Sequence, residues 1–163
     1  MNPARSIPFA RPSITDGERE AVAAVLQQDI LTHGPQTKAF EQEFAGFVGD
    51  EAHCVAVSSC MAALHLAYLT LGIGPGDEVL VSAQTHVATA HAVEAVGATP
   101  VFVDCRPDTG NMDPDRLESL ITPRTRAIGL VHFVGIPCEM DAIVAVAERH
   151  GLPLPEPHQH QRA

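Results

Sequence analysis

The sequence predicts an α/β fold with a largely parallel sheet and helices on both of its faces. Short apolar segments typical of strands alternate with segments of helical periodicity along most of the chain. Glycine-rich turns such as 72–76 separate these segments. The strand segments 101–103 and 128–131 are continuous apolar runs, as expected for strands that are covered on both faces.

Two helices are predicted before this alternation begins. Thr15 and Glu18 have the spacing of a capping box, so a helix should start there and run to about residue 28. Pro35 suits the first turn of a second helix, which Gly49 ends. Three aromatic residues of this second helix recur at helical spacing and predict a buried face: Phe40, Phe44 and Phe47.

The alternating part predicts four strands and four helices. The expected strands are 54–57, 78–82, 100–104 and 126–132. The expected helices are 60–71, 86–96, 114–121 and a last one that runs from about 140 to Gly151. Because neither an internal repeat nor a linker interrupts the pattern, residues 1–154 are predicted to form one domain.

The last residues break the pattern. Pro153, Pro155 and Pro157 alternate, and proline lacks the N–H donor that a central strand needs. We therefore expect residues 155–163 to be an aberrant and disordered tail.

Composition limits the partners. The 163 residues carry a net charge of −10 with only ten basic residues, which argues against binding of nucleic acid or of an anionic membrane. No apolar run has membrane-spanning length, and the start lacks the apolar core of a signal peptide, so a cytoplasmic location is expected. His150, His158 and His160 border or belong to the tail, where no second shell would fix them, so no metal site is predicted.

Two segments could carry chemistry. At Ser59, Cys60 and Met61 an apolar strand passes directly into a helix, whose free N–H groups can bind an anion; a plain serine cap is the simpler interpretation. His86 follows the strand 78–82, at the edge of a parallel sheet where ligands gather. It could stack on a ring or titrate, or it could be a solvated histidine, and the same alternatives hold for His132.

Together these segments resemble the DegT/DnrJ/StrS sugar aminotransferases. The resemblance runs from about residue 7 to 154, with many motifs in the family's order. The segments that carry it are Gly34-Pro35 with Phe40-Glu41, Val57-Ser58-Ser59 with Ala62-Ala63-Leu64, 71–79, 85–89, Gly97-Ala98 with 100–104, 121–125, and 131–141.

The resemblance implies part of the three-layer large domain of type I aminotransferases, which depend on pyridoxal 5′-phosphate (PLP), act on keto-sugar nucleotides in nucleotide-sugar biosynthesis and form homodimers. It makes Ser59, Cys60 and Met61 the cofactor-phosphate segment and places His86 where the family stacks an aromatic ring on the cofactor. The family has Gly and Thr where this chain has Cys60 and Met61, so the threonine hydroxyl is missing and weaker phosphate binding is expected.

The resemblance also implies that catalytic residues are missing. PLP transamination needs a Schiff-base lysine and an acid beside the pyridine nitrogen. Pro157 falls at the acid's position, and the only lysine, Lys38, has no matching context. No catalytic residue is therefore assigned, and the fragment is expected to be inactive alone. The alternative is a non-catalytic module that binds or dimerises; the chain is expected to aggregate or to pair with a relative.

Overall fold

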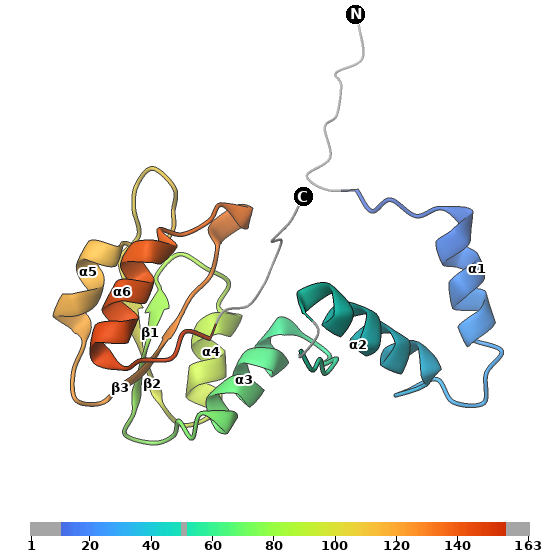
Figure 1. Ribbon diagram of the computed structural model, residues 1–163, viewed down its shortest axis with the longest axis horizontal. Coiled ribbons are helices and arrows are strands. Elements are labelled where there is room, and N and C mark those ends of the chain that lie inside the picture. Colours follow the sequence, from blue (N-terminus) through green and yellow to red (C-terminus); the bar gives the residue numbers. More distant parts are fainter. Residues whose placement is uncertain (1–10, 50–51, 156–163) are drawn as a thin grey trace, which may run out of the picture. The chain divides into compact units, whose positions relative to one another are not determined.

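The computed structural model describes residues 11–49 and 52–155 (Figure 1). The chain divides into two compact units, residues 1–56 and 57–163. Among the described residues, no helix has both the length and the apolar character needed to cross a bilayer. The expected tail lies outside the described residues except for Pro155, as do the tail histidines 158 and 160 and the residue at the acid's position, Pro157.

The first unit contains helices α1 (Asp16–Val25) and α2 (Pro35–Val48). Glu18 accepts hydrogen bonds from the backbone N–H (2.6 Å) and the hydroxyl of Thr15, which confirms the predicted start of α1. Pro35 occupies the first turn of α2, and the helix ends at Gly49, also as predicted.

The prediction of a buried aromatic face on α2 was wrong for the described chain. The side chains of Phe40, Phe44 and Phe47 are 57%, 43% and 64% exposed. Their rings contact one another, with centroids 5.9 and 6.3 Å apart. Helical spacing gathers apolar side chains on one face, but it does not supply the surface that covers them.

The predicted strand 54–57 is also absent: residues 52–57 belong to no strand. A strand requires a neighbouring backbone, and the N–H of Ala56 instead donates to Oε1 of Glu41 on α2, at 2.8 Å. Residues 54–57 therefore pair with no other strand of the described chain, although their apolar pattern is typical of a strand.

The second unit is a three-stranded parallel sheet with two helices on each face. The strands β1 (Glu78–Ser82), β2 (Thr99–Val103) and β3 (Thr125–Gly129) lie in the order β2-β1-β3. The helices are α3 (Cys60–Thr70), α4 (Ala88–Ala95), α5 (Pro114–Leu120) and α6 (Met140–His150). A short 3-10 turn, η1 (Phe133–Gly135), follows β3.

Different helices cover the two faces of the sheet (Figure 1), and each face holds a separate core. On one face α3 and α4 pack with Val79, Val81 and Ala127, and Tyr68 of α3 is completely buried there. On the other face α5 and α6 pack with the alternate strand residues Leu80 and Ile128. Because both faces are covered, the whole of β1 is buried, which confirms the predicted α/β fold with its parallel sheet.

The prolines after α6 contribute to the sheet, contrary to expectation. The backbone N–H groups of Ile128 and Leu130 donate to the carbonyl oxygens of Pro153 (3.1 Å) and Pro155 (3.2 Å). Leu154 packs against the core between α5, α6 and the sheet. Proline lacks a donor but keeps its acceptor, so an edge segment can still form half of a ladder.

Candidate functional site

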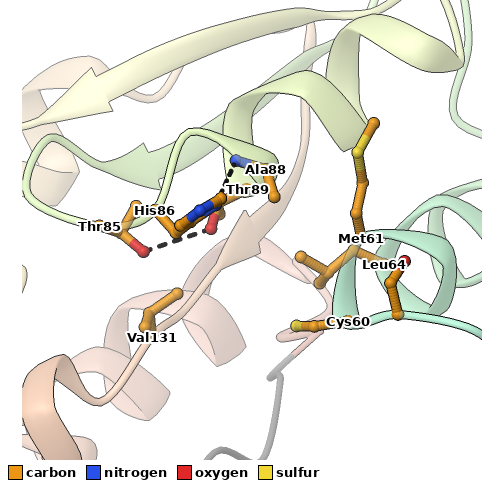
Figure 2. A pocket seen from close by; sticks show the side chains of 9 residues that line it. Cys60, Met61, Leu64, Thr85, His86, Ala88, Thr89 and Val131 are labelled. Carbon is orange, nitrogen blue, oxygen red and sulfur yellow. Dashed lines mark hydrogen bonds between the residues drawn. The ribbon is translucent and has the colours of Figure 1, made fainter. Parts of the chain in front are cut away.

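A cavity of about 420 Å³ opens at the carboxyl edge of the sheet, within the second unit (Figure 2). Its volume lies within the range of roughly 300–1,000 Å³ that is typical of small-molecule sites. The residues that line it come from the start of α3, the segment between β1 and α4, and the segment after β3: Ser59, Cys60, Met61, Leu64, Thr85, His86, Ala88, Thr89 and Val131. All four predicted site residues are among them.

The first turn of α3 presents backbone donors to this cavity. Ser59 is extended, and its side-chain oxygen accepts a hydrogen bond from the N–H of Ala62, at 3.1 Å. Within the described chain, the N–H groups of Cys60 and Met61 form no backbone hydrogen bond. The two interpretations of this turn are therefore compatible, because the serine cap uses one donor and leaves two for an anion at the positive end of the helix.

His86 lies on the segment that joins β1 to α4 (Figure 2). Its Nδ1 accepts a hydrogen bond from the N–H of Ala88, at 3.2 Å. This bond orients the ring and leaves the proton of the neutral imidazole on Nε2. The helix starts at Ala88 rather than at the predicted residue 86, so His86 belongs to a loop and is exposed to solvent.

Two hydroxyl groups lie beside His86. The Oγ1 atoms of Thr85 and Thr89 are 3.3 Å apart and form a hydrogen bond, which links the loop to the first turn of α4. Both residues line the cavity, and Thr89 is otherwise buried. The segment that carries His86 is therefore fixed at both ends of its turn.

His132 does not line the cavity, and it lies three residues after the end of β3 rather than at the end of the strand, as was predicted. It is buried, and its Nδ1 accepts a hydrogen bond from the N–H of Cys138, at 3.0 Å. Its neighbour Val131 lines the cavity instead. His150 does not line the cavity either, and its Nε2 lies 3.2 Å from Oε1 of Glu118 on α5.

Sequence reasoning missed several cavity residues, namely Leu64, Thr85, Ala88, Thr89 and Val131. A signal for some of them existed: residues that follow parallel strands meet at one edge of the sheet, and Thr85 and Val131 both follow strands. Leu64 lies one helical turn after Cys60, on the same face of α3.

The lining suits a ligand with an anionic end and a flat, weakly polar body. None of the lining residues is Lys, Arg, Asp or Glu, so an anion would rely on the helix N-terminus and backbone donors. Leu64 and Val131 offer apolar walls, and the imidazole of His86 offers a flat surface. The residues present therefore fit a phosphorylated aromatic cofactor, with the stacking group and the donors on different segments.

Comparisons with known proteins found a matching family model, similar sequences and similar structures. The model of the family described as "DegT/DnrJ/EryC1/StrS aminotransferase family" matches residues 12–158. The spore coat polysaccharide biosynthesis protein SpsC of Bacillus subtilis (strain 168) is 50% identical over 146 residues, which are 90% of this chain and 37% of SpsC. The chain thus spans little more than a third of this relative's length.

Solved structures show the same fold. DesV of S. venezuelae matches with a TM-score of 0.80 and 46% identity, over 86% of this chain and 38% of DesV. The putative sugar aminotransferase Spr1654 from Streptococcus pneumoniae, solved in its PMP-form, matches with a TM-score of 0.83 and 40% identity, over 90% of this chain and 37% of Spr1654. The described fold is therefore the fold of one part of these longer proteins.

Proposed function

Because the chain belongs to the DegT/DnrJ/EryC1/StrS aminotransferase family, whose members use PLP, we propose that its second unit is the cofactor-phosphate part of an aminotransferase acting on keto-sugar nucleotides. The observation that supports this most is the pair of unbonded N–H groups, on Cys60 and Met61, at the mouth of a cavity that also receives His86. The substrate class rests on the family and on relatives such as Spr1654.

Six of the nine cavity residues then have a role in holding the cofactor. Ser59 caps α3 by accepting the N–H of Ala62, while Cys60 and Met61 would donate their N–H groups to the phosphate. His86, whose ring is oriented by the hydrogen bond from the N–H of Ala88, would stack on the pyridine ring. Bound PLP would supply the electron sink that amino transfer requires. Leu64 and Val131 would keep water from the ring.

We further propose that this chain alone holds PLP without a covalent bond and does not transfer amino groups. Its one lysine, Lys38, lies on α2 in the first unit, and no residue of the cavity is an amine. Amino transfer needs a lysine that both holds the cofactor and moves protons. With neither that lysine nor an acid for the ring nitrogen, binding and chemistry should be separable in this chain.

The domain and partner assignments follow from the family as proposals. The family model runs through both units, so we propose that residues 1–154 belong to one large domain in the full-length relatives. The homodimer of the family, and a cytoplasmic location, are proposed on the same ground. Pairing with a full-length relative is the alternative role if the chain proves to bind no cofactor.

A substitution at Cys60 can test phosphate binding at α3 directly. Proline is well tolerated at the first position of a helix and removes one N–H group, and Ser59 already has the extended conformation that precedes a proline. Cys60→Pro should weaken PLP binding about tenfold or more, because a hydrogen bond to a charged group is lost. Cys60→Ala, which keeps the N–H, is the matched control and should bind like the wild type.

The binding is measured by the change of PLP absorbance on titration with the 163-residue chain, with inorganic phosphate as a competitor. Replacing Cys60 and Met61 with the family's Gly and Thr should tighten binding. Equal affinities of Cys60→Pro and Cys60→Ala would show that the phosphate does not lie at α3. A borohydride-reducible adduct at one residue, or amino transfer from glutamate to a keto-sugar nucleotide, would contradict the proposed non-covalent and inactive state.

A further inference from the structure

Asn111, between β2 and α5, is a buried polar residue that does not line the cavity. It is 2% exposed and lies 20 or more residues before the segment that it contacts. Its Oδ1 accepts a hydrogen bond from the N–H of Phe133 at 2.8 Å. Its Nδ2 donates to the carbonyl oxygens of Ile136 (2.9 Å) and Pro137 (3.1 Å). The carboxamide thus fills the inside of the loop 131–138 after β3.

The same loop is closed at its base by Cys138. The N–H of Cys138 donates to Nδ1 of His132 at 3.0 Å, and its Sγ donates to the carbonyl oxygen of Val131 at 3.3 Å. Val131, at the start of this closed loop, is the residue that lines the cofactor cavity (Figure 2). The position of the cavity wall is therefore tied to the position of the loop.

The loop holds a conformation that its sequence does not favour. Val134 has φ 48° and ψ 27°, in the left-handed region that β-branched residues avoid. Its side chain is 75% exposed, so packing does not compensate for the strain. Asn111 bonds the backbone on both sides of Val134, since its Oδ1 accepts from the N–H of Phe133 and its Nδ2 donates to the carbonyl oxygen of Ile136. A strained conformation persists only where such surrounding contacts hold it.

The loop after β2 is shaped to receive this turn. Gly110, next to Asn111, has φ 73°, and a Cβ there would lie 2.8 Å from the ring of Phe133. The ring thus occupies the space that any other residue at 110 would fill. Arg106 adds an ion pair to Glu139 at 3.1 Å, just after the loop.

We infer that Asn111 is a positioning residue for the cofactor cavity: by holding the loop 131–138 in its strained turn, its carboxamide sets the place of Val131 against the cofactor ring. The identity of the ligand rests on the proposed function, whereas the control of the loop and of Val131 by Asn111 does not. Asn111 need not touch the cofactor, because it acts through Phe133 and the closed base of the loop.

The first test needs no ligand. In Asn111→Asp the size is kept but a carboxylate faces the carbonyl oxygens of Ile136 and Pro137, and in Asn111→Ala all three bonds are lost. Both variants should shift the methyl NMR signals of Val131. Leu117→Ala, in the core under α5, is the control that lowers the melting temperature and leaves the Val131 signals in place. Unchanged Val131 signals in both Asn111 variants would overturn the inference.

The second test removes the backbone strain at Val134 and measures the melting temperature. It can be carried out in Asn111→Asp if Asn111→Ala folds poorly. Val134→Gly should raise the melting temperature of the wild type by relieving the left-handed strain. The gain should vanish in the Asn111 variants, where the turn is free to relax. Equal gains in both backgrounds would show that Asn111 does not hold the turn.

The third measurement links the loop to the ligand. The Asn111 variants should bind PLP about fivefold or more weakly than wild type, as expected for two coupled sites, while Leu117→Ala binds normally below its melting transition. If the wild type binds no PLP, the proposed function fails while the Val131 signals still decide the role of Asn111. If PLP binds equally to wild type and both Asn111 variants, the positioning role is overturned and the proposed function stands.

Discussion

The hydroxyl oxygen of Tyr68 lies 2.6 Å from the point that a Cβ atom on Gly129 would occupy. Tyr68, on α3, is completely buried, and its hydroxyl has no hydrogen-bond partner among the described residues. Gly129 is the last residue of β3. Because Gly129 has no side chain, the hydroxyl of Tyr68 has room beside the strand.

Gly129→Ala should therefore destabilise the chain. Overpacking of a buried site costs about 1–3 kcal/mol, whereas alanine at an unstrained backbone position would otherwise stabilise slightly. Urea unfolding of the two proteins measures the difference. In the background of Tyr68→Phe, which removes the clashing oxygen, the cost of Gly129→Ala should become much smaller; an undiminished cost would mean that another contact excludes the side chain.

Tyr68 should also give the chain a characteristic alkaline transition. Burial is the main cause that raises the pKa of Tyr68 from 10.0 to about 12, with a smaller contribution from Cys60. The folded state then keeps a proton that the unfolded state releases, so stability is unaffected below pH 10 and falls as the pH rises toward 12. The loss amounts to about 2–3 kcal/mol, from 1.36 kcal/mol per pKa unit.

Because Tyr68 is the only tyrosine and tryptophan is absent, the ultraviolet absorbance of tyrosinate follows this residue alone. The titration midpoint of the folded chain should lie near 12, and that of the urea-unfolded chain near 10. Tyr68→Phe should lack this part of the pH profile of stability. A midpoint near 10 in the folded chain would contradict the burial of the hydroxyl.

Glu78 should make the chain sensitive to acid. It is a buried carboxylate at the amino end of β1, and it accepts hydrogen bonds from the hydroxyl of Thr122 (2.5 Å) and from the guanidinium of Arg124 (Nε at 2.9 Å). The bond from Thr122 and then those from Arg124 lower the pKa of Glu78 below its usual 4.5. A lowered pKa stabilises the fold above pH 4.5, and this contribution is lost as the pH falls through the folded-state value.

The comparison of wild type with Glu78→Gln isolates this effect. The wild type should lose more of its free energy of unfolding than Glu78→Gln between neutral pH and pH 3, as measured by urea unfolding at each pH. Parallel pH profiles of the two proteins would show that the ion pair is too solvent-screened to matter.

The segment 153–155 should protect the chain from association. If the chain ended after Leu152, the N–H groups of Ile128 and Leu130 would lose their acceptors and Leu154 would leave the core. An unpaired strand edge of this kind favours pairing with another copy. Size-exclusion chromatography with light scattering should show larger species for the shortened chain, and equal elution of both chains would contradict this protective role.

The 163-residue chain should still oligomerise to some degree. β2 is at the other end of the described sheet, and Phe102 on it is 56% exposed. Further apolar side chains of α2 and α3 are also exposed, including Phe40 and Leu69. A monomer with a cooperative thermal transition would show that these surfaces do not drive association.

The sequence predicted what local chemistry determines. The capping box of Thr15 and Glu18 and the cap at Ser59 depend on neighbours within a few residues, and both were found. The alternation of strands and helices was found from residue 60 onward. The family resemblance named Ser59, Cys60, Met61 and His86 as cofactor-binding residues. They line one cavity, and their binding of the cofactor stays a prediction.

The remaining features depend on contacts distant in sequence. The exposure of Phe40 depends on what covers α2, and residues 54–57 lack a strand partner; neither follows from periodicity. The carbonyl bonds of Pro153 were overlooked because proline was judged only by its missing donor. The hydrogen bonds of Asn111 could not be predicted, because its partners follow 22–26 residues later in a loop with no regular sequence pattern.

The strand order β2-β1-β3 also determines which backbone amides of the sheet are protected from hydrogen exchange. β1 comes first in the chain and yet lies in the middle, so both later strands attach to a strand that has already been synthesised. Its amides gain partners on one side from β2 and on the other from β3, beneath helices on both faces. In native-state hydrogen exchange, the amides around Leu80 should open only with the whole unit, while those of β2, at the edge of the described sheet, can exchange through local fraying.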